Sequence, residues 1–162
     1  MTMVIEYFHA SVFGNGVKVA EEFRRQAGGI GVSVHVHHIR DVDPARLPTA
    51  DLYVFSSPGR RGKPIKDVRR FLGSVTLPPG SRYGLLTTEM APKPDKKTGQ
   101  VPSDESKWQR VRPILNEMLQ GKGLVEVAEG SVHVTGIKGP LEEGWQEKVA
   151  RFVEALSLTA AA

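Results

Sequence analysis

Near the N-terminus the chain reads Val4-Ile-Glu-Tyr-Phe-His-Ala-Ser-Val-Phe-Gly-Asn-Gly-Val-Lys-Val-Ala20. This stretch starts as an apolar run, passes through a glycine-rich turn and continues as an amphipathic pattern, which predicts a strand, a turn and a helix. The backbone N–H groups of Gly14, Asn15 and Gly16 would lie at the positive end of that helix without partners inside it. The turn therefore either binds an anion such as phosphate or simply connects the two elements.

The composition is that of a globular protein. The chain has 162 residues, 40% hydrophobic and 25% charged, which predicts a single domain over residues 1–162. It has no cysteine, so disulfides and thiolate chemistry are excluded. We expect a soluble, cytoplasmic protein, because no leader-like segment and no apolar run of about 18 residues is present. The net charge of +4 favours anionic ligands or acidic partners and is too small to indicate nucleic-acid binding.

Apolar runs and turn residues predict five strands alternating with four helices. The strands are expected at residues 4–8, 32–39, 51–55, 83–88 and 124–135, the last with an interruption near 129–130. The helices are expected to begin near Gly14, Pro64, Ser103 and Pro140. Residues 91–102 should form a long flexible loop and residues 157–162 a frayed tail.

This alternation predicts an α/β fold, a single-domain three-layer sandwich around a five-stranded parallel sheet in the order 2-1-3-4-5. Ligands bind such sheets at the carboxyl ends of the strands, where the winding direction reverses. For this order the reversal lies between the first and third strands. The loops at 11–16 and 56–62 should therefore face each other across one crevice.

Two histidine features are open to a functional interpretation. His35 and His37 alternate with valines on an expected edge strand, and a His-x-His pair can bind a metal. Because no third ligand is evident, we interpret the pair as a solvated strand face and assign no metal site. His9 directly follows the first strand, where it either contacts a ligand or has a structural role. No catalytic residue is assigned.

Three motifs together resemble the flavodoxin family, and the similarity extends over essentially the whole chain. They are Ser11-Val-Phe-Gly-Asn-Gly16, Ala50-Asp-Leu-Tyr-Val-Phe-Ser-Ser-Pro-Gly-Arg-Arg-Gly-Lys-Pro64 and Gly139-Pro-Leu-Glu-Glu-Gly-Trp145. The first is similar to the family's phosphate loop, Ser/Thr-x-Thr-Gly-x-Thr. The second is similar to the loop that covers one face of the flavin, and Thr87–Met90 sits where the family places the loop covering the other face.

The resemblance implies a non-covalently bound FMN. Its phosphate would lie on Ser11 Oγ and the amides of residues 13–16, and its ring would lie between residues 58–62 and 88–92. A backbone group of Gly59 would lie near the flavin N5, and Glu89 could approach the ring. The cofactor-binding residues implied in this way are Ser11, Phe13, Gly14, Asn15, Gly16, Ser57, Pro58, Gly59, Arg60, Arg61, Gly62, Thr88, Glu89 and Met90.

The sequence departs from the family pattern at the phosphate loop. Phe13 and Gly16 occupy the two positions where the family prefers threonine, so two hydroxyls are missing. Hydrogen bonds to a charged group contribute roughly 1.5–3 kcal/mol each, so their loss weakens binding by about two to four powers of ten unless it is compensated. Neither flavin-covering loop has an aromatic residue that would stack on the ring.

The charge also differs from that of typical flavodoxins, which are acidic. Residues 60–70 contain six cations and only one anion, Asp67. This cluster could steer an acidic redox partner or an anionic substrate towards the expected site. The alternative is an ordinary solvated helix face, and both interpretations stay open for Arg60 and Arg61.

The sequence therefore leaves two functions open. The first is an FMN-binding electron-transfer protein or small FMN-dependent oxidoreductase, with an electron carrier favoured over a substrate-specific enzyme. The second is a flavodoxin-fold module that has lost the flavin and binds an anion or another protein. A phosphoacceptor receiver domain is excluded, because it needs acidic residues where His9 and Ser56 stand. The oligomeric state is not determined by the sequence.

Overall fold

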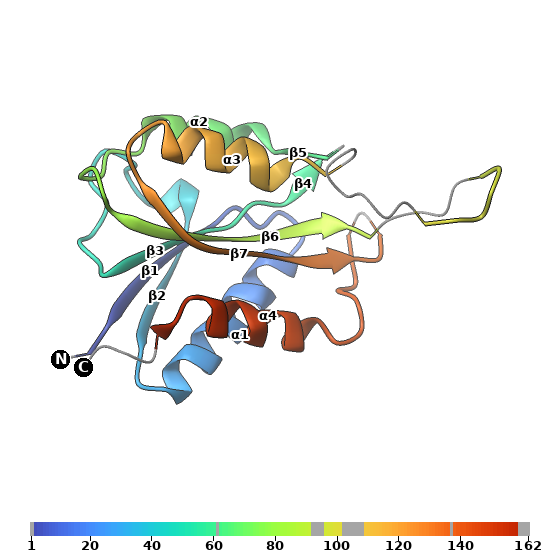
Figure 1. Ribbon diagram of the computed structural model, residues 1–162, viewed down its shortest axis with the longest axis horizontal. Coiled ribbons are helices and arrows are strands. Elements are labelled where there is room, and N and C mark those ends of the chain that lie inside the picture. The colour runs from blue at the N-terminus through green and yellow to red at the C-terminus, as the bar shows by residue number, and fades with distance from the viewer. Residues whose placement is uncertain (1, 61, 92–95, 102–108, 137, 159–162) are drawn as a thin grey trace.

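The computed structural model describes residues 2–60, 62–91, 96–101, 109–136 and 138–158 (Figure 1). Its main strands are β1 (Val4–His9), β2 (Ser33–His38), β3 (Leu52–Phe55), β6 (Arg82–Met90) and β7 (Val125–Val134). A small hairpin consists of β4 (Gly59–Arg60) and β5 (Lys63–Pro64). The helices are α1 (Asn15–Gly29), α2 (Lys66–Ser74), α3 (Val111–Gln120) and α4 (Trp145–Ala155), with a short 3-10 helix, η1 (Ile39–Asp41).

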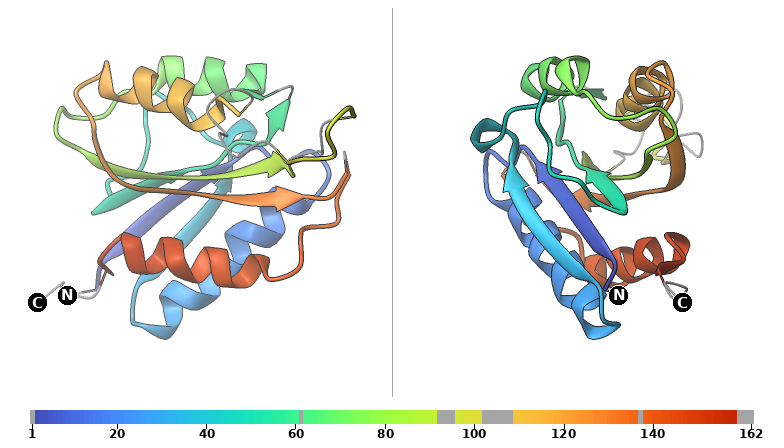
Figure 2. Two further views of the ribbon diagram at one scale, coloured as in Figure 1. Left: turned by 45° about the vertical axis from the view of Figure 1, so that its right-hand side comes forward. Right: turned by 90° about the vertical axis from the view of Figure 1, so that its left-hand side faces the viewer.

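The main strands form one sheet in the order β2-β1-β3-β6-β7, and every neighbouring pair is parallel. This confirms the expected 2-1-3-4-5 order and the edge position of the second strand. Helices α2 and α3 cover one face of the sheet and α1 and α4 cover the other, which gives three layers (Figures 1 and 2). The protein is thus the single-domain α/β sandwich that the alternation of elements predicted.

Each face of the sheet carries its own apolar core, because successive side chains of a strand point to opposite faces. In β1, Tyr7 packs with Phe23 of α1 and Phe152 of α4 on one side. Its neighbour Phe8 packs on the other side with Phe71 of α2. The central strands are buried on both faces, as expected for a parallel sheet covered by helices.

Two helices begin later than the sequence predicted. Pro64 belongs to β5, and α2 starts at Lys66. Pro140 precedes a bridge between Leu141 and Val134, and α4 starts at Trp145. Helix α3 starts at Val111, whereas the predicted start at Ser103 lies outside the described residues. A proline favours the first turn of a helix, but it also fits an extended segment. Pro64 and Pro140 both lie in extended segments just before a helix.

The last strand and the tail also differ from expectation. Strand β7 runs without a break through residues 129–130, and its irregularity lies next to Val127, opposite Tyr83 and Gly84. Leu158 is buried, so the tail is anchored at its beginning, while residues 159–162 lie outside the described part. Among the helices of the described ranges, none is long and apolar enough to cross a membrane.

Candidate functional site

The loops that follow β1, β3 and β6 start side by side at the carboxyl edge of the sheet. The backbone pairing continues past the strands, since Ser56 N donates to Phe8 O (2.9 Å) and Thr88 N donates to Ser57 O (3.1 Å). The loop before α1 and the loop that carries the β4–β5 hairpin therefore share one edge, as the predicted strand order requires. This edge lies on the right of Figure 1.

Residues 11–16 form what we call the anion loop. Gly14, the residue before α1, has φ of +93°, which favours glycine, and no side chain caps the helix. Ser11 Oγ accepts a hydrogen bond from Gly14 N (3.1 Å) and so holds the turn closed. The first N–H groups of α1 have no acceptor within the helix, and no acidic residue stands in its first turn. The loop thus presents donors and positive potential to an anion.

Two histidines hold the backbone of the anion loop in place. The Ser11 N–H donates to His9 Nδ1, and His38 Nε2 donates to the Ser11 carbonyl. In both hydrogen bonds the donor and acceptor atoms are 3.2 Å apart. His38 Nδ1 accepts from Arg40 N, which fixes its neutral tautomer, and the His9 and His38 rings meet edge to face at 5.1 Å. His9 therefore has a structural role. The role of His38 was not predictable from the sequence, because its contact crosses from β2 to the loop after β1.

We expect His9 to make folding stability depend on pH. Burial, followed by the nearby His38 and Arg40, lowers the pKa of His9 to about 4. Between pH 6.5 and 4 the His9 imidazole is protonated in the unfolded chain and neutral in the folded protein. The free energy of unfolding therefore falls as the pH falls, by up to about 3 kcal/mol from this group. Urea unfolding of wild type and His9→Asn at pH 7, 5.5 and 4.5 tests this. The His9→Asn variant should lose less stability on acidification than the wild type. Equal losses would show that His9 is not the source of the pH dependence.

The anion loop leaves little room for the two missing threonines. A Cβ on Gly16 would lie 3.0 Å from Ser11 Cβ, so a side chain there must displace Ser11. The Phe13 side chain is half exposed, and Lys138 Nζ lies 5.8 Å from its ring centroid. The Asn15 side chain lies against the backbone of Gly139, where a Cβ would come within 2.8 Å of its Oδ1. The hydrogen-bond donors that the loop can offer to an anion are thus its backbone amides and the Ser11 hydroxyl.

The loop after β3 packs down on the end of β6 and the start of α3. Pro58 pairs with Thr88 as an isolated parallel bridge, and Gly62 O accepts from Arg110 N (2.6 Å). At Gly59 a Cβ would lie 2.9 Å from Val111 Cγ2, so the close approach requires glycine. Ser57 is fully buried, and its hydroxyl donates to the Pro58 carbonyl.

Gln109 joins the two loops that were expected to cover a flavin, and the sequence did not single it out. Its side chain is 6% exposed, and its Nε2 donates to Met90 O (3.2 Å) at the end of β6. Its Oε1 lies 3.8 Å from the position of a Cβ on Gly59. This oxygen has no hydrogen-bond partner among the described residues. A buried acceptor without a donor is costly, and it marks a place where a ligand N–H or O–H fits.

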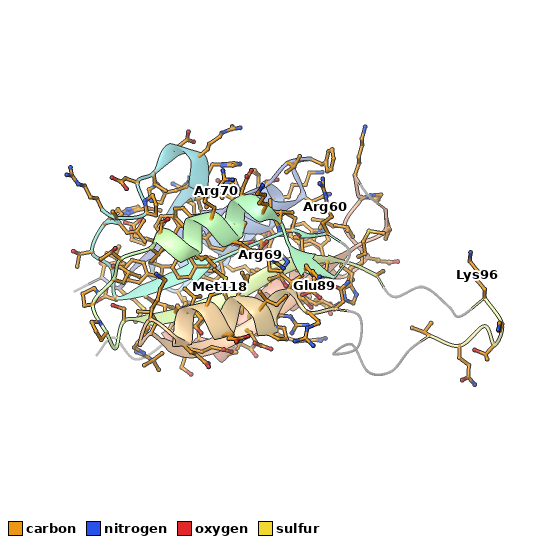
Figure 3. All side chains as sticks on the ribbon, turned by 90° about the horizontal axis from the view of Figure 1, so that it is seen from above. Arg60, Arg69, Arg70, Glu89, Lys96 and Met118 are labelled. Atoms are coloured by element: carbon orange, nitrogen blue, oxygen red, sulfur yellow. The ribbon has the colours of Figure 1, made fainter. Side chains whose placement is uncertain are left out.

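Glu89 does not lie at the edge with the loops. Its side chain is fully buried beneath α3, where Oε1 accepts from Arg112 Nε (3.1 Å) and from Thr87 Oγ1 (2.7 Å). Figure 3 shows Glu89 beside α3, the helix to which Arg112 belongs. Its position indicates a role in holding α3 to the sheet rather than contact with a ligand.

The His-x-His pair lies on a partly solvated strand face, with the His35 side chain 54% exposed and the His37 side chain 27% exposed. His35 Nδ1 and His37 Nε2 contact the two carboxylate oxygens of Glu6, at 2.8 and 2.5 Å. Glu6 is only 3% exposed, and His37 stacks on Phe8. The pair therefore satisfies a buried carboxylate across the β1–β2 boundary. In the part of the chain that the structure describes, no group of three such side chains could hold a metal ion.

The structure brings most of the expected residues to one edge. Ser11, Gly14, Asn15 and Gly16 form the anion loop, and Pro58, Gly59, Gly62, Thr88 and Met90 meet beside it through their backbones. Phe13 and Arg60 are exposed, Ser57 and Glu89 point inward, and Arg61 lies outside the described residues. Of the expected loop at 91–102, residues 96–101 extend away from the body of the domain, with Lys96 near the tip (Figures 1 and 3).

Comparison with known proteins identifies the fold. No protein-family model matches the chain, and no curated protein matches its sequence. Among solved structures, it is similar to a short-chain flavodoxin associated with a bacterial microcompartment, with a TM-score of 0.69 and 21% identity over 99% of this chain and 100% of that one. A variant flavodoxin of Fusobacterium nucleatum bound to flavin mononucleotide gives a TM-score of 0.64 and 10% identity over 97% of this chain and 96% of that one.

The fold also matches part of a larger enzyme. The rubredoxin oxygen oxidoreductase of Desulfovibrio gigas gives a TM-score of 0.66 and 17% identity, covering 98% of this chain and 37% of that one. The chain therefore has a flavodoxin-like fold, which it shares with complete flavodoxins and with about a third of that oxidoreductase. The identities are too low to carry more than the fold.

Proposed function

We propose that this chain binds FMN non-covalently at the carboxyl edge of its flavodoxin-like fold and takes part in electron transfer. The observation that carries the proposal is the anion loop, whose uncapped helix start lies at the edge where this fold accepts a ligand. When bound, FMN supplies the redox chemistry, and the protein supplies orientation and electrostatics. A protein with this role exchanges electrons with a redox partner protein.

The described residues fit the two ends of an FMN molecule. A phosphate would be held by the N–H groups at the start of α1 and by Ser11 at its edge. Gln109 Oε1 is a buried acceptor without a hydrogen-bond partner among the described residues, which suits an N–H on the edge of a flavin ring. Gly59 offers backbone groups without a side chain in the way. Since the two threonine hydroxyls are missing, we expect weaker binding than in a flavodoxin that has them.

Titration of the flavin fluorescence with FMN and with riboflavin tests this proposal. Riboflavin carries the same ring without the phosphate. We expect FMN to bind at least about tenfold more tightly, because charged acceptors at a helix start contribute more than about 1.4 kcal/mol. Equal affinities would show that the anion loop is not used, and no binding of either flavin would refute the proposal.

Gln109→Leu is expected to weaken FMN and riboflavin equally, by about fivefold to tenfold, because it removes one hydrogen bond of about 1 kcal/mol on the ring side. Gln146→Leu is the matched control, since Gln146 is exposed on α4. Both variants should unfold at wild-type temperature within a few degrees. An unchanged affinity in Gln109→Leu would remove Gln109 from the site.

One observation favours the second function, a module that has lost the flavin. A Cβ on Gly16 would lie 3.0 Å from Ser11 Cβ, so a hydroxyl-bearing side chain there requires Ser11 to shift by a few tenths of an ångström. Such a module would still bind an anion or a protein. Thermal unfolding with millimolar inorganic phosphate and with FMN distinguishes the two, because each ligand stabilises only if it binds the folded state. Stabilisation by phosphate alone would favour the module.

A further inference from the structure

The excess positive charge of this chain is confined to one segment. Residues 60–70 contain six cations and one anion, a net charge of +5, whereas the whole chain carries +4. The rest of the chain is therefore slightly negative. A charge concentrated in this way produces a local field rather than a general affinity for polyanions.

The structure exposes four of these six cations on the β4–β5 hairpin and α2. Arg60 and Lys63 lie on the β4–β5 hairpin and Lys66 and Arg70 on α2, and all four are exposed. Within the described ranges none of them forms an ion pair, and Asp67 forms none either. We call these four residues the basic surface. Figure 3 shows Arg60 at the hairpin end and Arg70 along α2.

Several cations elsewhere in the chain do form ion pairs. Arg25 pairs with Glu22 on α1, Lys148 pairs with Glu142 beside α4, and Arg112 pairs with Glu89. Paired surface charges add little to association, because their fields cancel within a short distance. The basic surface is therefore a described region where exposed cations gather along the sequence without described anionic partners.

The basic surface adjoins the edge where we propose that the flavin binds. Its hairpin starts at Gly59, which packs between Thr88 and Val111. Val12, Phe13 and Val17 lie at the same edge, and their side chains are 64%, 49% and 40% exposed. Exposed apolar side chains beside unpaired charges are typical of a protein interface, which has an apolar centre and a charged rim.

We propose that the basic surface, together with the exposed apolar residues of the anion loop, docks an acidic protein. On the proposed function that protein is the redox partner, and docking there would bring it next to the flavin edge. A protein fits better than a nucleic acid, because the cations cover one hairpin and one helix face and no aromatic side chain is interleaved with them to stack on bases. The rest of the chain has a net charge of −1, so it adds no net attraction for a long polyanion.

The test uses plant-type ferredoxin as an acidic protein, cytochrome c as a basic one and a 20-base-pair DNA as a polyanion. Their affinities for the full chain are measured by titration calorimetry, with and without added FMN, between about 20 and 300 mM salt. Two double variants reverse charges on the basic surface: Arg60→Glu/Lys63→Glu on the hairpin and Lys66→Glu/Arg70→Glu on α2. Arg82→Glu/Arg151→Glu is the control, because both residues are exposed, form no described ion pair and give the same change in net charge.

We expect ferredoxin to bind in low salt and to weaken at least about tenfold at 300 mM, and both surface variants to weaken it at least about tenfold. The control should change it less than about threefold, and cytochrome c should bind the wild type no better than the variants. Equal effects of all variants, or tighter binding of DNA than of ferredoxin, would overturn the proposal. Because binding is measured also without FMN, docking can hold even if the flavin proposal fails.

Discussion

Replacing Asn15 with aspartate should weaken FMN binding by about a hundredfold and leave riboflavin binding nearly unchanged. Asn15 is the first residue of α1, and aspartate has nearly its shape but adds a negative charge beside the anion loop. Two unit charges about 5 Å apart repel by roughly 3 kcal/mol at an effective dielectric constant of about 20. The same charge should stabilise the free protein by about 0.3–1 kcal/mol, because it interacts favourably with the helix N-terminus.

The opposite signs of these two effects separate a binding role from a folding defect. Fluorescence titrations give the flavin affinities, and urea unfolding gives the stability of the same samples. Asn15→Ser is the control, since it shortens the side chain without adding charge and should weaken FMN much less. If Asn15→Asp bound FMN as tightly as the wild type does, the phosphate would not lie at the start of α1.

Arg112→Met is expected to destabilise the fold by about 3–5 kcal/mol, the usual cost of removing one partner of a buried ion pair. Glu89 is fully buried, and the Arg112 side chain is only 18% exposed. The variant leaves the Glu89 carboxylate with the Thr87 hydroxyl but without its cation. Urea unfolding at pH 7 measures the loss.

The double variant Glu89→Gln/Arg112→Met removes the charge together with its partner. It should recover a large part of the lost stability, because an uncharged amide is far less costly to bury than an unpaired carboxylate. If the single and double variants were equally stable, the loss would come from packing of the arginine stem or from the broken ion pair with Glu129, and not from the unpaired Glu89 carboxylate. Flavin affinity should change little in the double variant, because Glu89 lies beneath α3.

The sheet and its order could be predicted from the sequence because they depend on local patterns. Apolar runs such as Val4–Phe8 can be buried only in a central strand, and helices between parallel strands leave few possible orders. The anion loop was predictable for the same reason, since Gly14 and Gly16 mark a turn between a strand and a helix. Local patterns were less reliable at the prolines, where Pro64 and Pro140 fit extended backbone as well as a helix start.

The other residues of the candidate site could not be predicted from local sequence patterns, because their roles depend on contacts between distant parts of the chain. Gln109 gains its role from Met90 and Gly59, and nothing in its own neighbourhood distinguishes it. His38 holds Ser11 across a strand boundary. Glu89 was itself expected to bind the flavin, yet the alternation of strand side chains turns it towards α3.

The most direct test of FMN binding is the visible absorption spectrum of the purified protein, recorded before and after incubation with FMN and gel filtration. We predict flavin bands near about 375 and 450 nm that elute with the protein, as the cofactor's own chemistry requires. The Asn15→Asp variant, treated in parallel, should elute with far less flavin. A wild-type protein that leaves the column colourless and retains no FMN would contradict the proposed function.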